Sequence, residues 1–317
     1  MDVVTDPGRC PSPPDGTVVT IGVYDGVHVG HRAVLAEVRD LADKRGCDTA
    51  VVTFEPHPAM VVRPDSAPLL LTDLDQKLEL LEACQVDHVV VIGFDQARSR
   101  QSAADFVAET LVGCLHARAV VVGHDFHFGH RRQGTVPFLA DQGSRHGFDV
   151  LGLSLQAEGG GAVTSTRIRG LLADGDVEAA AVLLGRPHEV RGVVAHGDGR
   201  GREWGFPTAN VTVPPGLCLP ADGVYAGWYV HPDGTKTASA ISLGRRPQVY
   251  EAKGERLLEP HLLDWEGDLY DQPAKVRFTH HLRPQERYPE VRDLLAQIGR
   301  DVEAARDSLA RFEHRPR

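Results

Sequence analysis

The run Asp25-Gly26-Val27-His28-Val29-Gly30-His31-Arg32 constrains this chain more than any other segment, because it places two histidines between a strand pattern and a helix pattern. Residues 18–23 are mostly apolar and β-branched, which is typical of a buried strand. From about Gly30 onward, apolar residues recur at the spacing of one helix face; they are Val34, Leu35, Val38, Leu41 and Ala42. The sequence therefore predicts a strand, a tight turn and a helix in that order.

A strand that leads into a helix start is suited to binding an anion. The first N–H groups of a helix lack partners within it, and the helix dipole is positive there. We expect Gly26 and Gly30 to line a phosphate site, with Gly30 removing a side chain that would hold phosphate away. His28 and His31 add donors whose hydrogen bonds strengthen as charge develops on a leaving pyrophosphate. An isolated His-x-x-His is more often a surface or capping pair, but this context favours ATP phosphates.

Bulk properties describe an ordinary globular protein of 317 residues, long enough for two domains. The formal net charge of -10 argues against nucleic-acid binding, so a polyanionic ligand must meet local arginines. No apolar run reaches the length of a membrane span, and we expect a cytoplasmic protein. The cysteines are odd in number and contain no C-x-x-C, so we expect reduced thiols; they are Cys10, Cys47, Cys84, Cys114 and Cys218.

The chain contains two regions with different sequence patterns. From about residue 17 to residue 185, apolar runs alternate with helix patterns, and they lie at residues 18–23, 50–54, 88–92, 119–122 and 150–155. Helices are expected at residues 74–84 and at 102–114, the second capped by Ser102 with Asp105 at its third position. This alternation predicts a parallel sheet covered on both faces, a Rossmann-like α/β domain.

After Arg186-Pro187, short alternating segments predict an antiparallel barrel or sandwich, and they lie at residues 190–195, 224–230, 238–243, 257–263 and 274–280. A helix over about residues 289–312 should close this second domain. We place the boundary between Leu184 and Glu189, with domains at 15–185 and 188–317.

Three further segments of the first half bear on function. Pro56 and Pro58 end the second strand abruptly and form a stiff ledge that could bound a flat ring system. Asp125 lies after the fourth strand, in a loop that could close over adenine and ribose; the histidines around it lack a familiar zinc spacing. The residues that open the next helix complete a second phosphate cradle; they are Ser165, Thr166 and Arg167.

In the second half, a Gly-rich loop with Gly197, Gly199 and Gly201 precedes an extended segment in which Thr208 and Asn210 share one face. Two neutral oxygens of this kind suit Mg²⁺ that bridges nucleotide phosphates. Glu259 is a single carboxylate on a strand pattern and could take the proton from a hydroxyl that attacks the γ-phosphate. Considered without its neighbours, the Gly-rich loop would be interpreted as a mobile hairpin. Glu259 would then be interpreted as a carboxylate at the rim of an edge strand.

These pieces, in this order, resemble the prokaryotic bifunctional riboflavin kinase/FMN adenylyltransferase family, also called FAD synthetase. The likeness runs from about residue 18 to residue 306. Its most specific strings are IGVYDGVHVGH, TFEPHP, TSTRIR, LLGRPHEVRGVVAHGDGRG, GFPTANV and PADGVYAG.

The resemblance implies an N-terminal adenylyltransferase and a C-terminal six-stranded barrel kinase, with ATP and Mg²⁺ used in both steps. It makes His28 and His31 the ATP-phosphate contacts, with Ser165, Thr166 and Arg167 as the second cradle. It also implies roles for single residues: Asp125 contacts the nucleotide, Pro56 and Pro58 border the flavin, Thr208 and Asn210 hold Mg²⁺, and Glu259 is the base. Riboflavin and ATP would give FMN, and FMN and ATP would give FAD and pyrophosphate.

Some kinase-side positions depart from the family pattern, notably Gln248, Asp271 and Gln285. They leave open a chain with one active domain: a monofunctional FMN adenylyltransferase, or a kinase for a modified flavin. A flavin-binding regulator without catalysis is a further alternative, but such a sensor has no use for Glu259 or the paired histidines. We expect small-molecule partners, no nucleic acid, no membrane, and a monomer or transient homo-oligomer.

Overall fold

The chain is described here from a computed structural model at residues 1–5, 9–154, 161–197, 200–245 and 256–313. It divides into two compact units, Met1–Ser165 and Thr166–Arg317. The division lies upstream of the boundary expected between Leu184 and Glu189, because two helices between these points pack with the barrel. That boundary stays a prediction about the functional domains. Among the described residues, no helix is long and apolar enough to cross a membrane.

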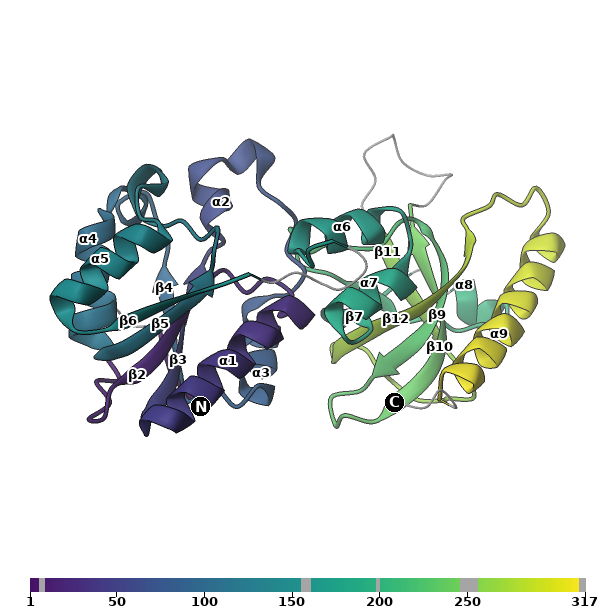
Figure 1. The fold of residues 1–317 in the computed structure, drawn as a ribbon. Helices are drawn as coiled ribbons and strands as arrows, with labels where there is room; N and C mark the ends of the chain where they lie inside the picture. The colour runs from purple at the N-terminus through teal and green to yellow at the C-terminus, as the bar shows by residue number, and fades with distance from the viewer. Residues whose placement is uncertain (6–8, 155–160, 198–199, 246–255, 314–317) are drawn as a thin grey trace. The chain divides into compact units, whose positions relative to one another are not determined.

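The first unit is built on a six-stranded sheet in the order β1-β4-β3-β2-β5-β6, with every pair parallel (Figure 1). The strands are β1 Asp2–Val4, β2 Thr17–Ile21, β3 Asp48–Glu55, β4 His88–Gly93, β5 Ala117–Gly123 and β6 Asp149–Leu153. The expected parallel sheet is confirmed. Sequence reasoning missed β1, because three residues are too short to show a period.

Helices cover both faces of this sheet, as the β-branched runs predict. Val18 and Val51 face α1 Val29–Arg45 and α3 Leu74–Ala83, whereas their neighbour Val19 packs in the opposite core. That second core lies under α4 Ala103–Phe106, η3 Val107–Cys114 and α5 Val136–His146 (Figure 1). The remaining short helices are α2 Pro58–Val62, η1 Pro64–Ser66, η2 Arg98–Arg100 and η4 His130–Arg132.

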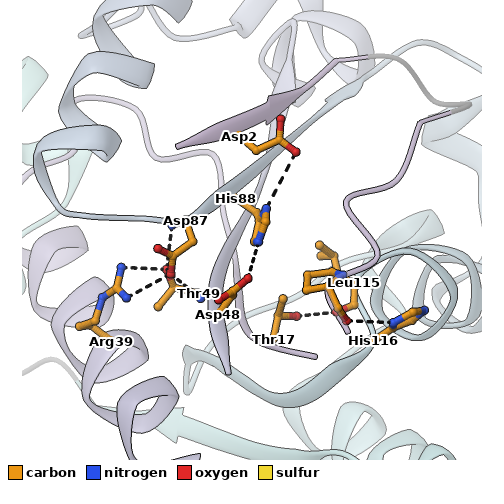
Figure 2. A network of polar contacts seen from close by, with 10 residues as sticks. Asp2, Thr17, Arg39, Asp48, Thr49, Asp87, His88, Leu115 and His116 are labelled. Carbon is orange, nitrogen blue, oxygen red and sulfur yellow. Dashed lines mark hydrogen bonds and ion pairs between the residues drawn. The ribbon is translucent and has the colours of Figure 1, made fainter. Parts of the chain in front are cut away.

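A polar network ties together the amino ends of neighbouring strands, at the edge of the sheet opposite the expected site (Figure 2). His88 Nε2 lies 2.8 Å from Asp48, and its Nδ1 lies 4.0 Å from Asp2. Asp87 accepts hydrogen bonds from both the N–H and the hydroxyl of Thr49. Although burial raises the pKa of Asp87, bonds from Thr49 and Arg39 hold it below its usual value. We assign this edge to stability rather than chemistry.

One sequence expectation about the cysteines is wrong in this structure: Cys10 and Cys114 form a disulfide across a separation of 104 positions. The reason is tertiary. Strand β1 pairs with β4, and Cys10 and Ser12, which follow it in sequence, both lie at Cys114, the last residue of η3. Ser12 N–H donates to the carbonyl of Cys114 there. The other cysteines form no disulfide with any described residue; they are Cys47, Cys84 and Cys218.

The second unit is a closed antiparallel barrel in the order β10-β11-β8-β7-β12-β9. Its strands are β7 His188–Ala195, β8 Asn210–Thr212, β9 Gly223–Val230, β10 Lys236–Gly244, β11 Leu257–Leu262 and β12 Pro273–Pro284. Closure as a barrel rather than a sandwich depends on β8, which joins β7 to β11 and is too short to predict from its pattern.

Three helices and a short turn complete this unit: α6 Ser165–Ala173, α7 Val177–Leu184, α8 Arg200–Glu203 and α9 Val291–Glu313. Helix α9 buries Ala305 and Leu309 against Ala226 and Ala240 of the barrel, which confirms the expected closing helix (Figure 1). On α7, Glu178 accepts a hydrogen bond from the His281 N–H of β12.

Candidate active sites

The paired histidines lie where the sequence predicts, at the start of α1. His28 is the N-cap, and its Nδ1 accepts a 3.3 Å hydrogen bond from the His31 N–H. A neutral ring that accepts at Nδ1 carries its proton on Nε2, which is then a donor. The two rings stack with centroids 3.6 Å apart and planes 13° apart. The two imidazoles therefore form one rigid unit at a helix N-terminus.

The His31 ring is poised to be a neutral donor rather than a cation. Burial holds the pKa of His31 well below its ordinary value, and the neighbouring His28 and Lys77 lower it further. The buried His31 Nδ1 has no hydrogen-bond partner among the described residues. An unpartnered buried nitrogen is costly unless a ligand satisfies it. This electrostatic setting fits an imidazole that hydrogen-bonds phosphate.

The turn before His28 holds its shape through backbone conformation and one buried carboxylate. Gly26 adopts φ +84°, and Val27, a β-branched residue, adopts φ +36°. Asp25 is 3% exposed, and its Oδ1 accepts from the N–H groups of Leu71 and Thr72. The Gly26 N–H donates to the Thr72 hydroxyl, so Gly26 acts on the shape of the turn.

Gly30 has a second reason to be glycine. A Cβ there would lie 3.3 Å from the His28 ring and 3.5 Å from the Val163 carbonyl. The contact with the ring is tight for a Cβ, so a side chain would press on the imidazole as well as on any ligand. Gly30 therefore preserves the position of His28.

The second expected cradle begins beside the first. Ser165, at the start of α6, donates its hydroxyl to the Asp25 carbonyl at 2.9 Å. Sequence analysis assigned Ser165 to the second phosphate cradle, and this bond holds its hydroxyl to the turn before His28. Thr166 and Arg167 follow on exposed positions of the same helix. Their contact with phosphate stays a prediction.

The other candidates of the first unit lie at the carboxyl ends of strands. Asp125 is exposed after β5, and Pro56 is exposed directly after β3. Pro58 occupies the first turn of α2. The histidines near Asp125 have separate partners: His127 Nδ1 lies 2.6 Å from the Asp125 carbonyl, and His130 Nδ1 lies 3.1 Å from the Ser99 carbonyl.

In the barrel unit, Glu259 lines a cavity of about 410 Å³ between the barrel and α9. Outward positions alternate with buried ones along β11, so Glu259 and His261 point the same way while Leu258 and Leu262 are buried. The cavity mixes aromatic and charged side chains; they include Trp204, Phe206, Arg283, Tyr288 and Asp301. A flat aromatic ligand with a hydroxyl near Glu259 fits this lining.

A second cavity of about 230 Å³ meets the first at Thr208, which lines both. The smaller cavity includes Trp265 and Tyr270. Thr208 is exposed and Ala209 buried, so Thr208 and Asn210 share a face as the sequence predicts.

The glycines of the neighbouring loop press against this face. A Cβ at Gly197 would lie 2.0 Å from the Asn210 side chain, and one at Gly201 would lie 3.3 Å from the Thr208 hydroxyl and 2.6 Å from the Phe206 carbonyl. Gly197 and Gly201 thus let the loop approach the two neutral oxygens. Gly199 lies outside the described residues.

The departures from the family pattern have local explanations where they are described. Asp271 adopts φ +60°, a left-handed conformation that glycine adopts most easily, and its N–H donates to the Val194 carbonyl. Gln285 Nε2 donates to the Ser242 hydroxyl and the Leu243 carbonyl, each at 3.2 Å. Its side chain occupies space that Gly244 leaves open. Gln248 lies outside the described residues.

Sequence reasoning missed a partly buried ion pair in the wall of the larger cavity. Arg283 donates to both carboxylate oxygens of Asp301, at 2.9 and 2.7 Å, and its guanidinium lies 5.9 Å from the Tyr288 ring centroid. Hydrogen bonding to Asp301 raises the pKa of Arg283 above its usual value. The only sequence signal was Asp301 on the apolar face of the last helix.

Comparisons with known proteins agree with both halves. The FAD synthetase family model matches residues 10–167, and the riboflavin kinase family model matches residues 184–309. The bifunctional riboflavin kinase/FMN adenylyltransferase of Escherichia coli strain K12 is 38% identical over 296 residues, covering 93% of this chain and 94% of that protein. The Pseudomonas fluorescens protein of the same name is 40% identical over 300 residues, covering 95% of each.

Among solved structures, one described as a macrolide-efflux protein from Streptococcus pneumoniae matches with a TM-score of 0.85 at 27% identity, covering 96% of this chain and 98% of that chain. The likeness therefore extends over the fold of both units. With both family models matched in order and relatives aligned over most of their length, the chain belongs to the bifunctional riboflavin kinase/FMN adenylyltransferase family.

Proposed function

We propose that each unit of this bifunctional enzyme performs one of the two reactions with the residues described above. The barrel unit transfers the γ-phosphoryl group of ATP to riboflavin, and the α/β unit adenylylates the FMN product. The observation that carries this division is Thr208, which lines both barrel cavities, one of which holds Glu259. A residue shared by two cavities is where a phosphoryl group can pass between their ligands.

In the kinase step, the larger cavity binds the flavin ring and the smaller one binds the nucleotide. Glu259 takes the proton of the riboflavin 5′-hydroxyl while the hydroxyl oxygen bonds to the γ-phosphorus, and ADP leaves. Gly197 and Gly201 let the loop backbone approach the phosphates, and Gly199 keeps the phosphate-binding role that the sequence predicts for it. Positioning supplies much of the acceleration, because phosphoryl transfer requires little covalent chemistry from the protein.

Mg²⁺ fits the donors at this loop. Thr208 and Asn210 offer neutral oxygens beside Gly201 and Gly197, where a side chain on either glycine would crowd them. Among the described residues, no group of three or more His, Cys, Asp or Glu could hold a metal ion. A site of two neutral ligands leaves the remaining positions to phosphates and water, as Mg²⁺ prefers. When bound, the ion neutralises phosphate charge.

In the adenylyltransferase step, His28 and His31 bind the ATP phosphates together with Gly26, Gly30 and the second cradle, which is formed by Ser165, Thr166 and Arg167. An oxygen of the FMN phosphate attacks the α-phosphorus in line, the bond to the β-phosphate oxygen breaks, and pyrophosphate leaves. The two imidazoles stabilise the charge that accumulates on this leaving group.

The remaining contacts place the two substrates of this step. Asp125 contacts the nucleotide, and Pro56 and Pro58 border the flavin. The enzyme acts on small molecules in the cytoplasm, as a monomer or a transient homo-oligomer.

A time course tests the proposal. Purified full-length chain is mixed with riboflavin, ATP and Mg²⁺, and flavins are resolved by chromatography. FMN should appear first and FAD should follow with a lag. The absence of FMN, or FMN that never becomes FAD, would contradict the assignment of both sites.

A further inference from the structure

Lys77 is a buried cation that the proposed chemistry has not yet used. It lies in the first turn of α3, where its N–H donates to the Asp73 carbonyl at 3.0 Å, and only 4% of the residue is exposed. Sequence analysis expected a helix at residues 74–84 and assigned no role to Lys77. A buried ammonium is costly for folding unless a partner compensates it, so its position calls for a function.

The described residues around Lys77 attract its ammonium electrostatically but form no hydrogen bond with it. Its charge interacts with those of Asp25 and Glu55; burial lowers the pKa of Lys77, and these carboxylates raise it only in part. Within the part of the chain that the structure describes, the ammonium forms no hydrogen bond. Asp25 already receives two backbone N–H groups at Oδ1. The ammonium thus retains donors for a further anion.

Hydrogen bonds made by the residues just before α3, and the electrostatic interactions of Lys77 itself, relate this cation to the site. Leu71 and Thr72, just before α3, bind the turn that leads to His28, which holds the start of α3 against the phosphate cradle. Lys77 also acts electrostatically on His31 within that cradle. Lys77 also interacts electrostatically with Glu55, which ends β3 directly before Pro56, the expected flavin ledge. Lys77 therefore interacts electrostatically with a residue assigned to ATP binding and with one that adjoins the residues assigned to flavin.

We propose that the Lys77 ammonium binds the phosphate of FMN and brings this nucleophile to the α-phosphorus of ATP. This inference rests on the proposed function of the first unit. Two highly charged anions must meet at this point, and a desolvated cation between them offsets their repulsion. No proton transfer is needed, because an oxygen of the FMN phosphate forms the new bond and pyrophosphate departs with the old one.

The test compares Lys77→Met, Lys77→Arg and Lys44→Met in the full chain. Lys44 is exposed in the last turn of α1 and is the matched control. For Lys77→Met we expect kcat/KM for FMN in FAD formation to fall about 100-fold, the size of one charge-assisted bond to phosphate. KM for ATP and the rate of FMN formation from riboflavin should stay within about twofold of the parent values. Lys77→Arg should recover at least a tenth of the lost efficiency, since it restores the charge.

Thermal unfolding separates this role from a structural one. Without ligands, Lys77→Met should unfold at the same temperature as the parent or higher, because it removes a buried charge that Asp25 and Glu55 compensate only in part. Unchanged kcat/KM for FMN, an effect on KM for ATP alone, or a lowered unfolding temperature in Lys77→Met would each overturn the inference.

A parallel His28→Ala/His31→Ala variant distinguishes failure of the Lys77 role from failure of the proposed adenylyltransferase site. If it loses FAD formation while Lys77→Met does not, the Lys77 inference fails and the proposed site stands. If it retains FAD formation, the proposed site itself fails.

Discussion

The hydroxyl of Ser165 donates a 2.9 Å hydrogen bond to the backbone carbonyl of Asp25, across 140 positions of sequence. This bond joins the start of α6 to the turn that presents His28. Ser165, the last residue of the first unit, and His28, which sequence analysis assigned to separate phosphate cradles, are thereby anchored to one turn. The adenylyltransferase site is consequently a tertiary construction whose parts come from both ends of the first unit.

Replacing both histidines of the cradle, His28→Ala and His31→Ala, should lower FAD formation from FMN by about 10²–10³-fold, because hydrogen bonds to the leaving pyrophosphate are lost. FMN formation from riboflavin should be unchanged, since the kinase residues lie in the barrel. Product chromatography from each substrate measures both rates. A parallel loss of both activities would contradict two separate sites.

Glu259→Gln should lower FMN formation and leave FAD formation unchanged, the reverse of the histidine variant. Removing the proposed base should lower FMN formation by about 10²–10⁴-fold while preserving the shape of the side chain. FAD formation from supplied FMN should continue at the parental rate, which serves as the internal control. Retention of kinase activity would show that the riboflavin hydroxyl loses its proton elsewhere.

Asn210→Ala should raise the Mg²⁺ concentration needed for half-maximal FMN formation by about tenfold, because one of two neutral oxygen ligands is removed. The measurement is a Mg²⁺ titration of kinase rate at saturating riboflavin. The matched control is Thr212→Ala, which removes an exposed polar side chain from the same short strand, β8. An equal shift in both variants would point to a strand defect rather than a metal ligand.

Stability of the barrel should fall as the pH drops from about 6.5 to 4. His188 is 2% exposed and its Nε2 donates to the Cys218 carbonyl, and burial lowers its pKa to about 4. In this pH range the unfolded chain therefore binds a proton at His188 that the folded barrel does not bind. This lowers the free energy of unfolding by about 3 kcal/mol. Above pH 6.5 both states are neutral and this contribution to pH dependence vanishes.

Urea unfolding followed by tryptophan fluorescence measures this effect, because all three tryptophans lie in the barrel unit: Trp204, Trp228 and Trp265. His188→Gln keeps an amide donor but cannot titrate, so it should remove most of the decline in stability between pH 6.5 and 4. An unchanged pH slope in that variant would exclude His188 as its source.

Asp301→Ala should destabilise the barrel unit by about 3–5 kcal/mol, because it leaves the Arg283 guanidinium partly buried without its carboxylate. The double change Arg283→Met/Asp301→Leu removes both charges and should recover much of this loss. Unfolding free energies of the parent and the two variants form the test. A double variant no more stable than Asp301→Ala would show that packing, not the unpaired charge, dominates.

Local patterns were enough for much of this protein, because they depend on neighbours in sequence. The strand and helix around His28, the cap at Ser102 and the shared face of Thr208 and Asn210 all follow from spacing. The parallel sheet, the barrel class and the family also followed from sequence patterns and motifs. These features require no knowledge of which distant segments meet.

Tertiary structure alone decided what depends on such meetings. Strands β1 and β8 are too short for a period, and their roles depend on the partners that they pair with. The Cys10–Cys114 bond, the Arg283–Asp301 pair and the burial of Lys77 each arise where separate elements pack together. Burial and charge pairing are properties of the packed chain, so the sequence determined which groups were present and the fold determined which of them face one another.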